Sequence, residues 1–251
     1  MNFELAGKRV LVTGASRGIG FGIAEAFHLE GCTVVSNGRS AANLASSIAK
    51  RKGWFGVVGD VTDPLKANDV VRQAVDLLGG IDVLVCNVGS GKSVPPGQEN
   101  FTDWQESLSV NLLSATNMVE AAVSELRKTK GVVVCISSIC GIEVVRGAPV
   151  TYSAAKAALN AYIRGISLPL GTDGVRINGI APGNILFDGS VWDEKIKKNA
   201  SGVEQMLVEQ IPLRRLGVPA DVTNLVLWLS SPLSSFNTGS IHVCDGGQTR
   251  S

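Results

Sequence analysis

The sequence has few of the residues that build metal centres and disulfide frameworks. Its 251 residues include only two histidines, and none of the five cysteines belongs to a C-x-x-C pair. Cys32, Cys86, Cys135 and Cys244 fall in or beside apolar runs, and Cys140 follows one. Cysteines scattered in this way are typically small buried hydrophobic residues. We therefore expect neither disulfides nor a metal site, and no histidine-based triad.

The sequence also lacks an excess of one charge and long apolar runs. Its 23 basic and 22 acidic residues leave a net charge of +1, so no strong field would attract nucleic acid or an anionic membrane. No uninterrupted apolar run approaches the roughly 18 residues of a membrane span. Residues 1–5 lack the basic-then-apolar pattern of a signal peptide. We expect a soluble, cytoplasmic protein whose partner is a small-molecule substrate, not nucleic acid or a membrane.

Apolar, strand-like runs alternate instead with helical patterns from end to end. The expected strands cover residues 9–13, 33–36, 54–58, 81–86, 132–137, 175–180 and 240–244. The expected helices cover residues 18–30, 42–50, 64–78, 102–128, a stretch opening near 152, and 220–229. This alternation predicts an α/β protein with a doubly wound, Rossmann-type fold and a seven-stranded parallel sheet. We expect a single domain over residues 1–251, with a polar substrate lid at about 184–210.

A glycine-rich loop follows the first expected strand. Residues 13–20 read T-G-A-S-R-G-I-G, and glycines there allow a tight turn and the close approach of a pyrophosphate to backbone N–H groups. The start of the following helix favours negative charge. The alternative is a plain glycine turn, but the position after the first strand favours a phosphate site.

The end of the second expected strand indicates which dinucleotide binds. A carboxylate there would accept the ribose 2′-hydroxyl of NAD, whereas an arginine accommodates the 2′-phosphate of NADP. Asn37 and Gly38 supply no acid, and Arg39 and Ser40 follow. Arg17 is a candidate second cation. The sequence therefore favours NADP(H), although both arginines can also be read as solvated surface residues.

Tyr152 and Lys156 are four residues apart in one expected helix, so they lie on the same face. A free tyrosine has a pKa of about 10, and a neighbouring cation lowers it toward the range in which acid–base catalysis is efficient. The alternative is an ordinary half-buried helix face. Other motifs favour the catalytic interpretation.

Taken together, these residues resemble the short-chain dehydrogenase/reductase family over nearly the whole chain. The family's loop T-G-x-x-x-G-x-G matches residues 13–20, and its Y-x-x-x-K motif matches Tyr152 and Lys156. The other matches are the adenine-side acid at Asp60 followed by Val61, the N-A-G signature at Asn87-Val88-Gly89, the helical asparagine at Asn111, the catalytic serine at Ser138, the P-G at Pro182-Gly183, and the C-terminal D-G-G at residues 245–247.

The resemblance implies reversible hydride transfer between NADPH and a carbonyl carbon, which interconverts a ketone and a secondary alcohol. Tyr152 would exchange the proton, Lys156 would lower its pKa and bind the nicotinamide ribose, Ser138 would hold the carbonyl oxygen, and Asn111 would hold a water that links Lys156 to solvent. The expected cofactor-binding residues are Gly14, Ser16, Arg17, Gly18, Ile19, Gly20, Arg39, Ser40, Asp60, Val61, Asn87, Gly89, Tyr152, Lys156, Pro182, Gly183 and Ile185. The expected substrate contacts are Ser138, Tyr152, Phe187 and Trp192.

Three features depart from the family pattern. The interval from Ser138 to Tyr152 is one residue longer than in many relatives, which leaves Ser137 open as an alternative donor. Phe187 stands where relatives often carry a threonine that contacts the nicotinamide carboxamide. Pro169 falls late in the catalytic helix, which it is expected to kink or end.

The substrate stays open at this level. The chain resembles 3-oxoacyl-carrier-protein reductases, so a 3-oxoacyl thioester is one candidate, and a sugar-derived or other anionic molecule is the alternative. A catalytically silent NADP(H)-binding sensor or scaffold is a third interpretation, but Asn111, Ser138, Tyr152 and Lys156 are all present. The resemblance also implies a homo-oligomer, either a tetramer or a dimer.

Overall fold

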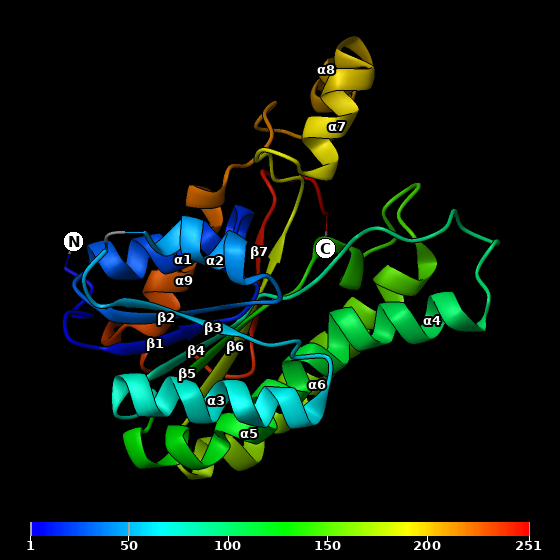
Figure 1. The fold of residues 1–251 in the computed structure, drawn as a ribbon. Helices are drawn as coiled ribbons and strands as arrows, with labels where there is room; N and C mark the ends of the chain where they lie inside the picture. The colour runs from blue at the N-terminus through cyan, green and yellow to red at the C-terminus, as the bar shows by residue number, and fades with distance from the viewer. Residues whose placement is uncertain (1, 50, 251) are drawn as a thin grey trace.

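The computed structural model describes residues 2–49 and 51–250, which form a parallel sheet between two layers of helices (Figure 1). Within these residues the sheet has seven strands in the order β3-β2-β1-β4-β5-β6-β7. They are β1 Arg9–Val12, β2 Thr33–Gly38, β3 Trp54–Val58, β4 Val83–Cys86, β5 Val132–Ile136, β6 Arg176–Pro182 and β7 Ile241–Cys244. Every neighbouring pair is parallel. The predicted doubly wound α/β fold is confirmed.

The inner strands are apolar throughout because helices cover both faces of the sheet. Alternate residues of one strand enter different cores: Val10 and Val12 pack with the cluster beneath α1 and α9, and Leu11 packs with the cluster beneath α3, α5 and α6. The helices of the first layer are α1 Gly18–Leu29, α2 Ala41–Ile48 and α9 Pro219–Ser230. Those of the second are α3 Pro64–Leu78, α4 Phe101–Leu108, α5 Ser114–Thr129 and α6 Val150–Thr172.

The structure corrects two predictions about helices in the second layer in part. The expected helix over residues 102–128 is a helical run in which a π-helical segment, Ser109–Leu113, separates α4 from α5. Pro169 does not end α6, which continues to Thr172. The missing N–H of Pro169 removes one hydrogen bond from the last turns of the helix, and the remaining turns still form.

The polar stretch expected as a lid contains two helices that the sequence analysis missed, α7 Val191–Lys198 and α8 Ala200–Gln210. Both stand away from the sheet (Figure 1). The Ser190 side chain caps α7 by accepting a hydrogen bond from Asp193 N, acidic residues fill the first turn, and lysines fill the last. This charge order stabilises a helix without an apolar stripe. No helix of the described residues is long and apolar enough to cross a membrane.

Candidate active site

The ends of β1 and β4 are tied together beneath the glycine-rich loop. The Thr13 hydroxyl donates to Val85 O at 3.2 Å and accepts from Asn87 N at 2.9 Å. The Asn87 amide donates to the carbonyls of Thr13 and Gly14 at 3.0 and 3.2 Å. Asn87, expected to bind the cofactor, therefore fixes the loop through its side chain.

The loop has the shape of a phosphate cradle. Gly14 and Gly18 have φ values of 61° and 59°, in the left-handed region that favours glycine. A Cβ on Gly20 would collide with the Gly14 carbonyl. Arg17, the residue before α1, provides no side-chain cap, and the first turn of α1 carries no acid. The first N–H groups of α1 are therefore available to an anion, and the loop fits the pyrophosphate of a dinucleotide.

The end of β2 carries a cation and no acid. The Arg39 guanidinium is largely exposed and lies 3.9 Å from Asp60 Oδ2. Asp60 also accepts hydrogen bonds from the backbone and hydroxyl of Thr62, and these bonds together with Arg39 hold its pKa below the usual value despite burial. Asn37 is directed to β3, where its amide donates to Val57 O and Gly59 O. The positions expected for a 2′-phosphate are thus an exposed arginine and Ser40, which caps α2.

The two serines after β5 have different partners, which answers the question that the sequence left open. Ser137 donates to Asn160 Oδ1 at 2.6 Å, in the core beneath α6. Ser138 lies close enough to Tyr152 to lower the pKa of that phenol, and its hydroxyl accepts from Cys140 N at 3.1 Å. Ser138 is therefore the serine that faces the tyrosine, and Ser137 is a structural residue.

Lys156 is 2% exposed and extends along α6 to the end of β5, where its ammonium donates to Ile136 O at 2.8 Å. Burial lowers its pKa to about 8. A Cβ placed on Gly89 would lie 3.1 Å from Lys156 Nζ and 3.2 Å from Asn111 Oδ1. A side chain at position 89 would be tightly packed, because the lysine and asparagine head groups converge there.

The pKa of Tyr152 departs from the expectation. Burial raises it to about 12, the Cys140 thiol adds to the increase, and the hydrogen bond with Ser138 acts in the opposite direction. The sequence predicted that Lys156 would lower this pKa, and that direction was wrong. The physical reason is that desolvation of the phenol raises its pKa by more than the interaction with Ser138 lowers it. Burial also lowers the pKa of the lysine, which disfavours its charged form.

Asn111 lies in the π-helical segment and holds the loop after β4. The side-chain oxygen of Asn111 accepts a hydrogen bond from Ser90 N at 2.8 Å. Its side-chain nitrogen donates to Ser90 O and Ser107 O, each at 3.1 Å. Single π turns inside α-helices recur at functional sites. The loop held in this way passes near Tyr152, since a Cβ added to Gly91 would lie 3.9 Å from Tyr152 Cζ.

The two expected substrate contacts on the lid, Phe187 and Trp192, have neighbours other than Tyr152. The Phe187 ring packs against Gly18 of the glycine-rich loop. Trp192 lies in α7 with the Lys195 ammonium 4.2 Å from its ring centroid. The lid meets the loop after β4 through Lys92 and Glu194, whose charged atoms are 3.4 Å apart.

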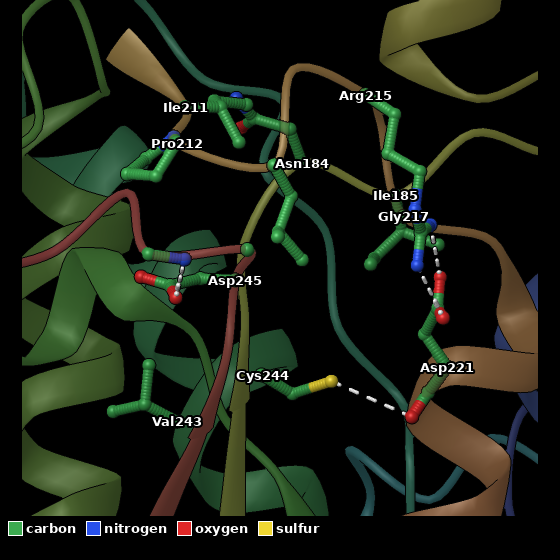
Figure 2. A pocket seen from close by; sticks show the side chains of 13 residues that line it. Asn184, Ile185, Ile211, Pro212, Arg215, Gly217, Asp221, Val243, Cys244 and Asp245 are labelled. Carbon is green, nitrogen blue, oxygen red and sulfur yellow. Dashed lines mark hydrogen bonds and ion pairs between the residues drawn. The ribbon is translucent and has the colours of Figure 1, made fainter.

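A pocket of about 550 Å³ lies at the ends of β6 and β7 (Figure 2). Ile185 and Cys244 line it, together with an ion pair between Arg215 and Asp221 at 2.7 Å. Among the described residues, the pocket lining includes none of the expected catalytic residues Asn111, Ser138, Tyr152 and Lys156. It is therefore distinct from the place where the acid–base groups meet.

The remaining expected cofactor residues differ in what they can offer. The side chain of Val61 is buried in the core, and its carbonyl accepts from Asn117 at 3.1 Å. Pro182 ends β6, and Gly183 N donates to Cys244 O at 3.0 Å. Ile19 packs on the core, which leaves its backbone and that of Ser16 facing the loop.

Several residues that shape the site were missed. They are Ser90 on the loop after β4, Asn117 beneath Val61, Cys140 near Tyr152, Asn160 behind Ser137, and Glu194 on the lid. Asn117 and Asn160 carry a signal, since amides inside apolar helix faces are unusual unless they bond to backbone or buried groups. The pairing of Lys92 with Glu194 spans 102 positions, and no local pattern marks it.

Comparison with known proteins places this geometry in context. A family profile described as enoyl-(acyl carrier protein) reductase matches residues 14–249. The 3-oxoacyl-[acyl-carrier-protein] reductase FabG of Aquifex aeolicus is 35% identical, over 98% of this chain and 99% of that protein. The 7alpha-hydroxysteroid dehydrogenase of Escherichia coli K12 is 32% identical, over 98% of this chain and 96% of that protein.

The fold is also similar to solved structures. The crystal structure of L-sorbose reductase from Gluconobacter frateurii, complexed with NADPH and L-sorbose, has a TM-score of 0.93 and 27% identity, and the match covers 100% of both chains.

Proposed function

The chain belongs to the short-chain dehydrogenase/reductase family, and on that premise we propose that it interconverts a ketone and a secondary alcohol by hydride transfer with NADP(H). The observation that carries this proposal is that Ser138 and Tyr152 lie next to each other at the end of β5, with the buried Lys156 ammonium on the same helix as the tyrosine. The nicotinamide supplies or accepts the hydride when it is bound, and the protein's residues orient the reactants and move the proton.

Tyr152 acts as the acid in the reductive direction. With a pKa of about 12, its hydroxyl is protonated at neutral pH and can donate to the alkoxide that develops on the carbonyl oxygen. Ser138 donates to the same oxygen and so stabilises negative charge as it forms. Lys156 provides positive charge one helical turn away, and the Asn111 side chain converges with it beside Gly89, where a water held by the asparagine would link Lys156 to solvent.

The preference for NADP(H) is supported by the end of β2. Arg39 is exposed there, Ser40 begins α2, and Asn37 is engaged with β3. An arginine at this position accommodates a 2′-phosphate, and the absence of a carboxylate at Asn37 or Gly38 removes the usual ribose acceptor of NAD-binding proteins. The L-sorbose reductase of similar fold is complexed with NADPH.

A 3-oxoacyl thioester is the first substrate candidate, supported by the 35% identity to the FabG reductase. A keto sugar or another small polar ketone is the second, supported by the similarity in fold to L-sorbose reductase. The matched profile is described as an enoyl reductase, so an enoyl thioester belongs in the same comparison.

The test is NADPH and NADH oxidation by the purified protein with 3-oxoacyl thioesters, enoyl thioesters, keto sugars and simple ketones. We expect turnover of at least one ketone and faster turnover with NADPH than with NADH. Tight NADP(H) binding without turnover of any ketone would contradict the enzyme proposal and favour a dinucleotide sensor. Reduction restricted to enoyl thioesters would contradict the ketone chemistry.

We also propose a homo-oligomer, a tetramer or a dimer. The outer side of β7 is an open strand edge in the sheet order, with Val243 exposed on it, and an open edge favours pairing with another chain. The outer face of α6 exposes Val150 and Leu168. Burying such apolar side chains between subunits is favourable.

A further inference from the structure

The Phe187 ring lies where the sequence pattern places the cofactor's pyrophosphate. A Cβ placed on Gly18 would lie 2.6 Å from Phe187 Cε2 and 2.9 Å from Cζ, so the ring covers that face of the glycine. In a dinucleotide loop the second glycine lacks a side chain so that the pyrophosphate can approach the backbone. Gly18 is the second glycine of this loop, and an aromatic ring faces it here.

The covered backbone is the part of the loop best suited to an anion. Gly18 is the first residue of α1, and no side chain caps the helix. A benzene ring has no hydrogen-bond acceptor to offer these N–H groups, so it can cover the anion site but cannot take the place of a phosphate. The ring and the pyrophosphate therefore compete for the same space. Only the pyrophosphate can accept hydrogen bonds from the N–H groups.

Phe187 is joined to the start of the lid helix α7. Ser190 N donates to Phe187 O at 3.0 Å, and Phe187 N donates to Ser190 Oγ at 3.3 Å. The same Ser190 hydroxyl accepts from Asp193 N at 3.1 Å and so caps α7. The Ser190 side chain bonds both to residue 187 and to the first turn of α7. A displacement of residue 187 is therefore transmitted to that turn.

The other side of α7 reaches the substrate end of the site. Glu194 lies 3.4 Å from the Lys92 ammonium, and Lys92 follows Gly91, where an added Cβ would come within 3.9 Å of Tyr152 Cζ. A continuous set of contacts therefore runs from Gly18 through Phe187 and α7 to the loop over Tyr152.

From this geometry we propose that Phe187 gates the dinucleotide site: its ring must leave Gly18 before a pyrophosphate can bind, and its departure moves α7. This inference rests on the proposed function, and it names a residue that controls cofactor entry. Phe187 is a gating residue and takes no part in proton transfer. Cofactor entry then precedes and alters the closure of the lid over the substrate.

Binding of NADP⁺ to the protein in the absence of substrate tests the proposal, because the readout does not depend on turnover. We expect Phe187→Ala to bind NADP⁺ about tenfold more tightly than the wild type. This factor applies if about one-tenth of the wild-type molecules are in the binding-competent form, with the ring away from Gly18. The association rate constant should rise as well. Phe187→Leu, which keeps an apolar but smaller side chain, should lie between the two. Phe236→Ala, at a fully exposed phenylalanine, is the matched control and should bind as the wild type does.

Trp192 emission provides a second readout, since Trp192 lies in α7. NADP⁺ should change this emission in the wild type, with Trp192→Phe identifying the signal, and should change it less in Phe187→Ala. Unchanged or weaker NADP⁺ binding by Phe187→Ala would overturn the gate. Failure of the wild type to bind NADP⁺ at all would instead overturn the proposed function, so the two failures are distinguishable.

Discussion

In the proposed reaction Tyr152 carries the reactive proton, and the desolvation of its phenol and its proximity to Ser138 support that role. We expect Tyr152→Phe to lower kcat by about 10²–10⁴-fold, the usual contribution of a positioned general acid, while the Kd for NADP⁺ stays within about twofold, since the aromatic ring is retained. Steady-state rates and calorimetric binding measure the two quantities. Tyr162→Phe is the matched control, because Tyr162 is the other tyrosine of the chain and packs on the core from the same helix. Equal rates in both variants would remove Tyr152 from this role.

The buried ammonium of Lys156 should make stability depend on pH. Burial lowers its pKa from 10.5 to about 8, so between about pH 8 and 10.5 the unfolded chain binds more protons than the folded protein, and the free energy of unfolding rises with pH. This stabilisation is complete above 10.5 and is lost as the pH falls to 8. The shift corresponds to about 3 kcal/mol.

Urea unfolding of the wild type and Lys156→Met at several pH values measures this effect, since other titrating groups cancel in the difference. The wild type should gain stability relative to the variant as the pH rises from 8 to 10.5. A difference that is independent of pH would show that the ammonium is not desolvated in the folded protein.

The sequence predicted which residues share the catalytic helix face, because a spacing of four is sufficient for that. It did not predict the direction of the Tyr152 pKa. That direction depends on how far folding removes the phenol from water and on the neighbouring Ser138 and Cys140. Likewise the sequence left Ser137 and Ser138 open, and the packing of Asn160 against Ser137 separates them.

Among the elements, the π-helical segment Ser109–Leu113 positions the loop over Tyr152 through Asn111. We expect Asn111→Ala to leave Ser90 N without its acceptor, a loss of about 1–3 kcal/mol of local stability for a buried donor. Hydrogen exchange at Ser90 should then accelerate about tenfold or more, and kcat/KM should fall.

Asn117→Ala provides the comparison for this variant. Asn117 lies in the same helical run and donates to the backbone at Val61 and Thr62, so its loss should accelerate exchange around those residues and leave Ser90 protected. Unchanged exchange at Ser90 in Asn111→Ala would contradict the assigned role of Asn111.

The helices that the sequence predicted well are those with an apolar stripe and a cap. For α3, Asp63 accepts from the first turn, Pro64 begins the helix and Gly79 ends it in the left-handed region, and all three are readable signals. The helices α7 and α8 were missed because only one of their residues, Val203, is buried, so only a weak apolar period marks them. The π segment was missed because it changes hydrogen bonding within one helical run, and hydrophobic periodicity does not record that change.

At the scale of the molecule, the sheet was predictable because strands covered on both faces read as short apolar runs. The arrangement of the lid was not, because it depends on pairs far apart in the sequence, such as Lys92 with Glu194 and the ring of Phe187 with Gly18. The general architecture follows from local patterns, whereas the specific closure of the site follows from contacts between distant segments.

The outer face of α6 gives the proposed oligomer a direct test. Leu168 in α6 and Leu65 in α3 are each 75% exposed, so as single residues they should tolerate glutamate equally. If α6 forms a subunit interface, Leu168→Glu places a charge in an apolar contact, where an unpaired charge is strongly disfavoured. Light scattering should then show a lower molecular mass for Leu168→Glu and the wild-type mass for Leu65→Glu. A monomeric wild type, or equal masses for both variants and the wild type, would show that this face does not join subunits.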